Sequence, residues 1–160
     1  MFVIEESDTE KVNTGTAVLS LLADASDTEG VIGADRISIA AGADGAKPHH
    51  HKASSEIFYV LDGKLAILLH DRVETVGKGG LLVVPPGTRH AFGAAAGYSV
   101  DLLVIATPGV ERFEYFRLLP AILRNEFSEN QLDDMHARYD VYFEDSPEWI
   151  AARQVAPVMA

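Results

Sequence analysis

The chain has no cysteine among its 160 residues. Disulfide bonds and thiolate metal sites are therefore excluded. Basic residues are also scarce, since 13 lysines and arginines stand against 24 aspartates and glutamates and the net charge is −11. A charge of this sign and size argues against a nucleic acid or an anionic membrane surface as the partner.

Long apolar runs are missing as well. No stretch approaches the roughly 20 apolar residues that a membrane-spanning helix needs. The first residues, MFVIEESDTEK, are acidic, so we expect no signal peptide. Together with the lack of cysteine, this favours a cytoplasmic location. The length and the 48% apolar content are those of one domain with a real core, and two full domains are not expected.

Short segments with β-strand character, separated by turn signals, fill the first two thirds of the chain. We expect strands at 2–4, 16–22, 36–41, 56–61, 64–70, 73–76, 80–84 and 98–107, and a glycine-bearing loop at 42–48 that leads to the histidines. The turn signals include Asp62-Gly63 and Pro85-Pro86-Gly87. Many short strands at this spacing predict an antiparallel sandwich or barrel, although the pattern alone does not choose between barrel types.

After Pro108-Gly109 the pattern becomes helical. Phe113 and Phe116 stand three residues apart in 111–119, and Pro120 interrupts that segment or begins the next turn. Ser128 and Gln131 form a capping box, and Ser146-Pro147 indicates a further helix start. We therefore divide the chain into a β-barrel at 1–110 and a helical extension at 111–160 that packs on the barrel.

The stretch that organises the chain holds five of the six histidines, between residues 45 and 94. His49 and His51 lie two residues apart in an extended segment, so both point to one face and His50 points to the other. Glu56 follows at the start of an apolar run, and His90 comes after a proline-glycine turn. Three imidazoles and a carboxylate can converge on a divalent transition metal with positions left for substrate.

This stretch resembles the two motifs of the cupin superfamily. The first motif is matched by His49, His51, Glu56 and Gly63, with four residues between His51 and Glu56 and six between Glu56 and Gly63. The second is matched by the set Gly79, Pro85, Gly87 and His90. Two positions depart from the pattern: Ala94 stands where the family has asparagine, and Ala43 stands where it has the first glycine. Neither departure removes a metal ligand.

The resemblance implies an all-β fold, the cupin double-stranded β-helix or jelly-roll barrel, followed here by the helical extension. It also implies a metal site made by His49, His51, Glu56 and His90, holding Fe, Ni, Mn, Co, Cu or Zn. Within the family the chain is similar to bacterial quercetinase-like dioxygenases. A flavonol or related enolisable aromatic substrate would then react with O2, and Glu56 would be the base. The family further implies a homodimer.

Other interpretations stay open at this stage. The same Lewis acid could act without oxygen, as in cupin isomerases or polyketide cyclases, or the barrel could bind a small molecule without catalysis. Phe58 and Phe92 share strand parity with Glu56 and His90, so they either line a pocket above the metal or belong to the barrel core. We interpret His50 as a structural or surface residue.

Overall fold

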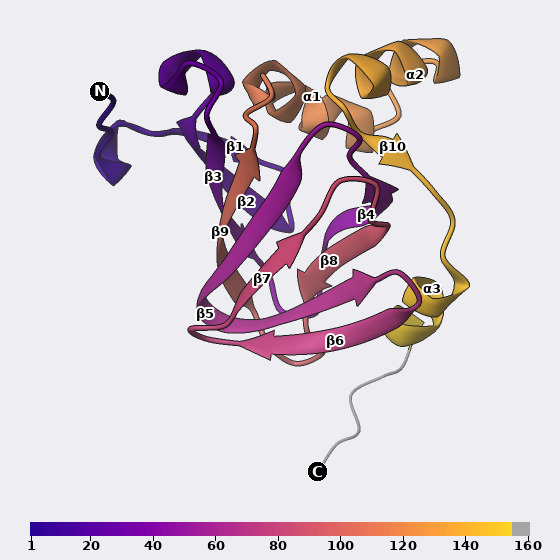
Figure 1. The fold of residues 1–160 in the computed structure, drawn as a ribbon. Helices are drawn as coiled ribbons and strands as arrows, with labels where there is room; N and C mark the ends of the chain where they lie inside the picture. Colours follow the sequence, from indigo (N-terminus) through magenta and orange to yellow (C-terminus); the bar gives the residue numbers. More distant parts are fainter. Residues whose placement is uncertain (155–160) are drawn as a thin grey trace.

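The computed structural model describes residues 1–154 and shows a curled, antiparallel ten-stranded sheet with three helices at the C-terminal side. Figure 1 shows the strands curling into a barrel-like arrangement, with two of the helices above one end and the third beside β6. The strands are β1 (Glu10–Asn13), β2 (Ala17–Ala23), β3 (Gly33–Ile39), β4 (Asp44–His50), β5 (Ser55–Leu69), β6 (Arg72–Gly77), β7 (Leu81–Val84), β8 (His90–Ala94), β9 (Val100–Thr107) and β10 (Tyr142–Phe143).

Strand order within the sheet is β1-β2-β3-β9-β5-β8-β4-β10, with β6 and β7 paired to β5. The pairs from β3-β9 through β8-β4 join strands that are distant in sequence, as in a jelly roll. This arrangement confirms the predicted all-β jelly-roll barrel with a helical extension. Its interior is filled by large apolar side chains at alternate strand positions. The most deeply buried of these are Phe58, Val60, Leu65, Ile67 and Leu102.

The prediction of two separate strands at 56–61 and 64–70 is wrong, because β5 runs without a break from Ser55 to Leu69. Its first half pairs with β9 and its second half with β8, and a register shift lies between Val60 and Asp62. Gly63 lies just beyond it with φ 76°, and a Cβ there would lie 2.0 Å from the Ser99 carbonyl oxygen. Asp62-Gly63 is thus a bend within one strand rather than a hairpin turn.

Two expectations near the N-terminus also differ from the structure. Residues 2–4 form no strand, and the first strand is β1 at Glu10–Asn13, a segment too polar to stand out in the sequence. β1 forms because it pairs antiparallel with the apolar β2. The glycine-bearing segment before the histidines, expected to be a loop, is strand β4, because it pairs with β8 and β10. Two short 3-10 turns complete this half: η1 (Glu6–Asp8) and η2 (Ala25–Thr28).

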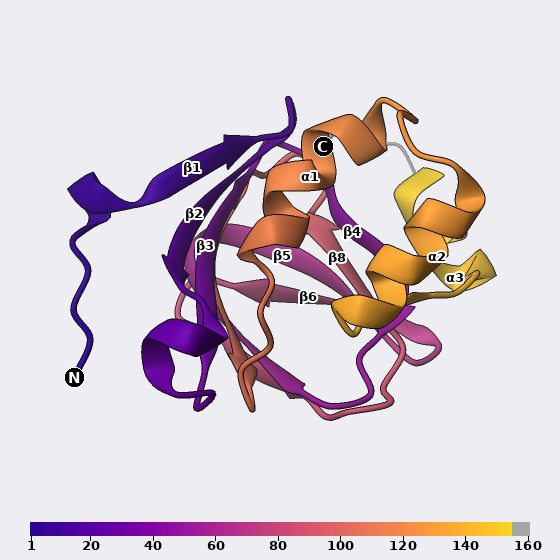
Figure 2. The same ribbon diagram turned by 90° about the horizontal axis from the view of Figure 1, so that it is seen from above.

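The helices are α1 (Phe113–Leu123), α2 (Glu129–Arg138) and α3 (Pro147–Gln154). Figure 2 shows α1 lying across one end of the barrel, with α2 beside it. Pro120 lies inside α1 and does not end it, since a proline near the last turn removes only one backbone hydrogen bond. The predicted capping box of Ser128 and Gln131 is confirmed at the start of α2. Within residues 1–154, no helix has the length and apolar character needed to cross a membrane.

Candidate metal centre

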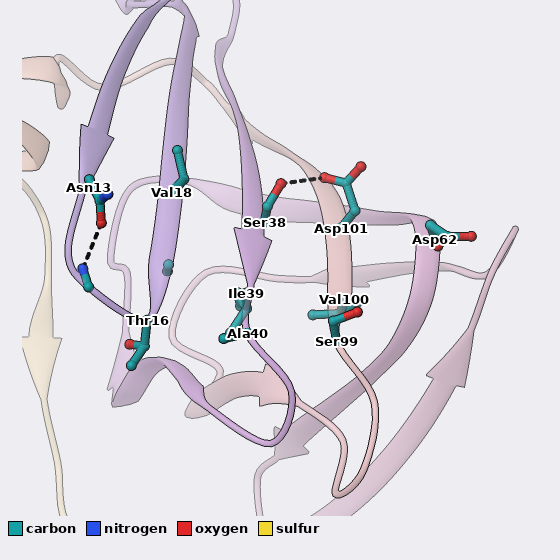
Figure 3. A pocket seen from close by; sticks show the side chains of 12 residues that line it. Asn13, Thr16, Val18, Ser38, Ile39, Ala40, Asp62, Ser99, Val100 and Asp101 are labelled. Carbon is teal, nitrogen blue, oxygen red and sulfur yellow. Dashed lines mark hydrogen bonds between the residues drawn. The ribbon is translucent and has the colours of Figure 1, made fainter.

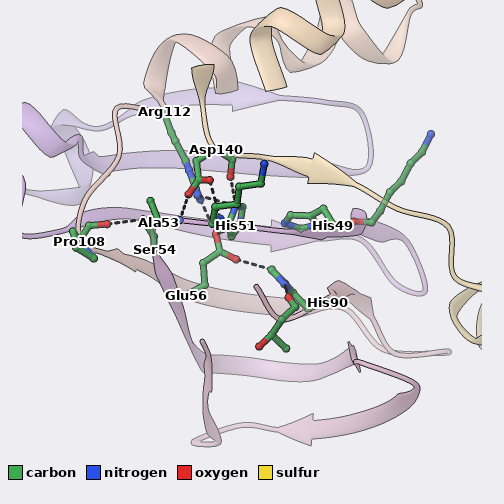
Figure 4. A network of polar contacts seen from close by, with 12 residues as sticks. His49, His51, Ala53, Ser54, Glu56, His90, Pro108, Arg112 and Asp140 are labelled. Carbon is green, nitrogen blue, oxygen red and sulfur yellow. Dashed lines mark hydrogen bonds and ion pairs between the residues drawn. The ribbon is translucent and has the colours of Figure 1, made fainter. Parts of the chain in front are cut away.

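The four residues singled out in the sequence meet inside the barrel. One ligand atom from each of His49, His51, Glu56 and His90 lies within 4.8 Å of all the others, and all four residues are buried. His49 and His90 are direct cross-strand partners on β4 and β8, which places their imidazoles side by side. Figure 4 shows Glu56 and His90 pointing toward each other, with His51 and His49 close by.

Strand alternation sorts the three consecutive histidines as predicted. The side chains of His49 and His51 are almost fully buried, whereas His50 is partly exposed and makes an ion-pair contact with Glu144 through Nδ1. The ring of His50 also stacks on Tyr142. His50 is therefore occupied on the outer side of β4, away from the ligand group.

All three inward-facing imidazoles are fixed in the same tautomer. Nδ1 of His49, His51 and His90 lies 2.7, 2.5 and 2.9 Å, respectively, from a backbone carbonyl oxygen. A carbonyl oxygen can only accept, so each Nδ1 carries a proton and donates it. Each Nε2 is then free to donate a lone pair at the centre of the group, the arrangement that metal-binding histidines use. Burial, together with the neighbouring His90 and His51, lowers the pKa of His49 well below its ordinary value, which keeps that ring neutral.

Glu56 contacts both flanking histidines and one cation. Its Oε2 lies 3.0 Å from Nε2 of His90, and its Oε1 lies 3.1 Å from Nε2 of His51. Nη1 of Arg112, from the residue that precedes α1, donates to Oε1 at 2.7 Å. Burial by itself would raise the pKa of the Glu56 carboxyl, but His51, His90 and Arg112 outweigh it and hold that pKa well below its usual range. The carboxylate is therefore ionised.

Arg112 is a site residue that sequence analysis missed. Its side chain is buried, it lies 56 residues from Glu56 in the chain, and no motif marks it. Its position is fixed through the backbone: the N–H groups of Arg112 and Phe113 donate to the two carboxylate oxygens of Asp24, at 2.8 and 3.1 Å. Nη2 of Arg112 also lies 3.0 Å from Nδ1 of His51, but that nitrogen already donates to a carbonyl. Glu56 is thus the main partner of the guanidinium.

Asp140, from the segment between α2 and β10, is a second residue that the sequence did not indicate. Its carbonyl oxygen accepts the proton from Nδ1 of His51. Its carboxylate accepts from the N–H groups of Lys52 and Ala53, at 2.8 and 2.9 Å, so it also fixes the turn that follows His51. Asp140 has φ 55°, a left-handed conformation that aspartate tolerates better than most residues.

The two candidate pocket residues, Phe58 and Phe92, pack into the barrel core. Phe58 has no exposed surface, and its ring lies edge-on to Phe92 at a centroid distance of 5.1 Å. Phe58 also contacts the ring of His90, at 6.3 Å. Phe58 therefore supports His90 from the apolar interior, and Phe92 packs against Phe58.

A cavity of about 10 Å³ lies beside Glu56, under the start of α1. Its polar lining includes Asp35 on β3 and Arg112, and its apolar lining includes Phe113 and Phe116. Burial, with a smaller contribution from the nearby Glu56 carboxylate, raises the pKa of the Asp35 carboxyl to about 8 against the opposing effect of Arg112. Asp35 is a third site residue without a sequence signal, because it only precedes an expected strand.

A larger groove of about 430 Å³ lies elsewhere and contains none of the four ligand residues. Figure 3 shows its walls, which come from the β1–β2 turn, the end of β3, the bend in β5 at Asp62 and the start of β9. Asp101, one of its two acidic wall residues, accepts hydrogen bonds from Ser38 and from Arg36. The groove is thus separate from the metal centre.

Ala43 and Ala94, the two positions that depart from the cupin motifs, contact each other. The N–H of Ala94 donates to the carbonyl of Ala43 at 2.9 Å, which joins the ends of β4 and β8. Arg153 of α3 donates to the carbonyl oxygens of Ala94 and Gly42, at 2.8 and 2.7 Å, and forms an ion pair with Asp44. A guanidinium from the helical extension therefore bridges the two loops where the family pattern has asparagine.

The donor set fits a divalent transition metal. Three neutral imidazoles and one carboxylate are the ligands that such ions prefer. Nε2 of His51 is buried and makes no hydrogen bond within the described residues, as expected for an atom that serves as a ligand. When bound, a metal would supply Lewis-acid character or a site for dioxygen.

Comparison with known proteins agrees with the fold. Residues 35–106 match the model of the cupin domain family. No curated protein matches the sequence. Among solved structures, the Streptomyces protein Pac13 with uridine has a TM-score of 0.58 at 19% identity, over 70% of this chain and 85% of that one.

Two further solved structures are similar in the same way. The polyketide cyclase RemF from Streptomyces resistomycificus has a TM-score of 0.57 at 23% identity, over 68% of this chain and 80% of that one. An RmlC-like cupin from Shewanella frigidimarina has a TM-score of 0.58 at 19% identity, over 70% of this chain and 93% of that one. At such identities the likeness concerns the fold. The strand order and the match of residues 35–106 to the cupin domain family agree with this fold.

Proposed function

We propose that the chain is a metal-dependent enzyme acting on a small molecule, with the metal held by His49, His51, Glu56 and His90. The observation that carries this proposal is the common tautomer of the three imidazoles, whose Nε2 atoms are left to face one carboxylate within a buried group. A purely structural cluster of histidines would not require all three Nδ1 protons to be bound to backbone carbonyls.

For the reaction we propose oxygen-dependent cleavage of a flavonol or a related enolisable aromatic compound. Such a substrate has adjacent hydroxyl and keto oxygens and loses a proton before it reacts. Glu56 is ionised and buried, so it can accept that proton at Oε1 or Oε2. Arg112 would then steady the carboxyl in the position it takes beside His51. Because all four candidate ligands are buried, part of the surrounding structure must shift to admit an aromatic ring.

A non-oxidative reaction is the second candidate. The specific observation in its favour is that Arg112 holds Glu56 through a hydrogen bond from Nη1 to Oε1 at 2.7 Å, which suits a fixed acid–base group that needs no oxygen. Structures with the same fold include a polyketide cyclase and a nucleoside dehydratase. A binding protein without catalysis is the third reading, and the dense packing of Phe58 and Phe92 favours it over a wide substrate chamber.

The deciding experiment is metal analysis of the purified protein combined with oxygen uptake on a panel of flavonols. We expect about one redox-active metal per chain, with uptake lost in Glu56→Gln and His51→Ala. Metal with turnover under anaerobic conditions would move the assignment to the isomerase or cyclase class. Metal without turnover in either atmosphere would favour the binding protein, and failure to bind any metal after loading would overturn the proposal.

A further inference from the structure

The small cavity beside Glu56 is bounded by two polar atoms that have no partner. Oδ2 of Asp35 and Nε of Arg112 are both buried, and neither makes a hydrogen bond within residues 1–154. Both residues line the same cavity of about 10 Å³. Unpaired polar atoms are costly in a protein interior, and two of them facing one space indicate a missing partner.

The chemistry of the lining restricts what that partner can be. Nε of Arg112 carries a fixed proton and can only donate, so a cation is excluded there. Asp24, Asp35 and the ionised Glu56 line the same space, so an anion is disfavoured as well. The volume is close to the minimum that one water molecule requires. A neutral oxygen able both to accept and to donate satisfies each requirement.

We propose that this cavity is a binding site for a single water molecule, which accepts from Nε of Arg112 and bonds to Oδ2 of Asp35. The site does not depend on the charge of Asp35, because water can donate to a carboxylate or accept from a carboxylic acid. The water links Asp35 to the guanidinium whose Nη1 holds Glu56 at 2.7 Å. Asp35 thus supports the orientation of Glu56 from β3, through the water and Arg112.

A crystal structure of the metal-free protein, at a resolution that shows ordered water, tests the site directly. We expect one density peak within hydrogen-bonding distance of both Oδ2 of Asp35 and Nε of Arg112. An empty cavity, or direct contact between the two side chains, would refute the proposal. Because no metal takes part, this outcome is independent of whether the protein proves to be a metal enzyme.

A solution measurement complements the crystal. Magnetisation transfer in NMR from bound water to the Nε–H of Arg112 should be seen in the wild type and in Asp35→Asn, which keeps a polar group, and should be lost in Asp35→Val. Equal signals from Arg112 in the wild type and in Asp35→Val would show that Asp35 does not hold the water.

Discussion

The backbone carbonyl of Asp140 accepts the Nδ1 proton of His51 at 2.5 Å, across 89 residues of sequence. The helical extension is therefore part of the candidate metal centre and does more than cover the barrel. The strand that follows, β10, pairs with the histidine-bearing strand β4, with Phe143 opposite His49 and Tyr142 opposite His50. Two of the four ligand residues are thus held from the C-terminal side.

Asp140→Ala should weaken metal binding by roughly 10- to 100-fold, the range seen when the hydrogen-bond partner of a metal-ligating histidine is disturbed. The carboxylate that fixes Lys52 and Ala53 is lost, and alanine does not favour the left-handed conformation. Asp140→Asn should be milder because asparagine tolerates this conformation and keeps one acceptor. Competition with a chromogenic chelator measures the affinity. Asp134→Ala, at an exposed position on α2, is the control. Equal affinity in Asp140→Ala and the control would rule out this role.

Arg112→Met should lower the free energy of unfolding of the metal-free protein by about 3–5 kcal/mol, since it leaves a buried carboxylate without its cation. Combining it with Glu56→Gln should recover much of this loss, because the uncompensated charge is gone. Denaturant titration of the wild type, the two single variants and the double variant gives the coupling energy between Arg112 and Glu56. Arg124→Met, which removes an exposed pair with Glu126, should change stability by less than about 0.5 kcal/mol. Additive effects of the two buried substitutions would contradict the pairing.

The stability of Asp35→Asn relative to the wild type should depend on pH. The pKa of Asp35 is about 8 in the folded protein and about 3.9 when unfolded. A pKa raised by folding contributes stability that is fully present below the unfolded value and is lost as the pH rises toward the folded value. Asparagine cannot ionise. The free energy of unfolding of Asp35→Asn relative to that of the wild type should therefore rise between about pH 4 and about pH 8. Unfolding free energies measured across this window decide the point, and parallel curves would mean that Asp35 is not a buried neutral acid.

Arg153→Met should destabilise the protein by roughly 1–3 kcal/mol, because two carbonyl oxygens lose a charged donor. The change should also loosen the ends of β4 and β8, seen as faster hydrogen exchange at the Ala94 N–H, which donates to Ala43. Arg72→Met is a matched control, because its guanidinium is exposed and its nearest acidic partner, Glu74, is 3.9 Å away. Unchanged exchange at Ala94 would show that α3 does not secure these loops.

The sequence was sufficient for the features that depend on local spacing. Alternation along an extended segment placed His49 and His51 on one face and His50 on the other, and the apolar strand pattern with its turns indicated the barrel. It failed where a local signal had two structural meanings. Asp62-Gly63 resembles a hairpin turn in sequence, yet it forms a bend in β5, because the close approach of the Ser99 backbone requires a glycine there.

The sequence by itself predicted that His49 and His51 share one face, because period-two alternation acts within a single extended segment. The spacing of the strands and turns predicted an antiparallel sandwich or barrel, and the motif spacing added Glu56 and His90 to the candidate ligands. Only the tertiary structure brought in Arg112, Asp140 and Asp35. Each of these meets the metal centre across a long sequence separation, 56 residues for Arg112 with Glu56 and 89 for Asp140 with His51. Such contacts follow from the strand order and from the pairing of β10, in the extension, with β4. Strand order and pairing depend on how apolar faces pack together, which no local pattern encodes.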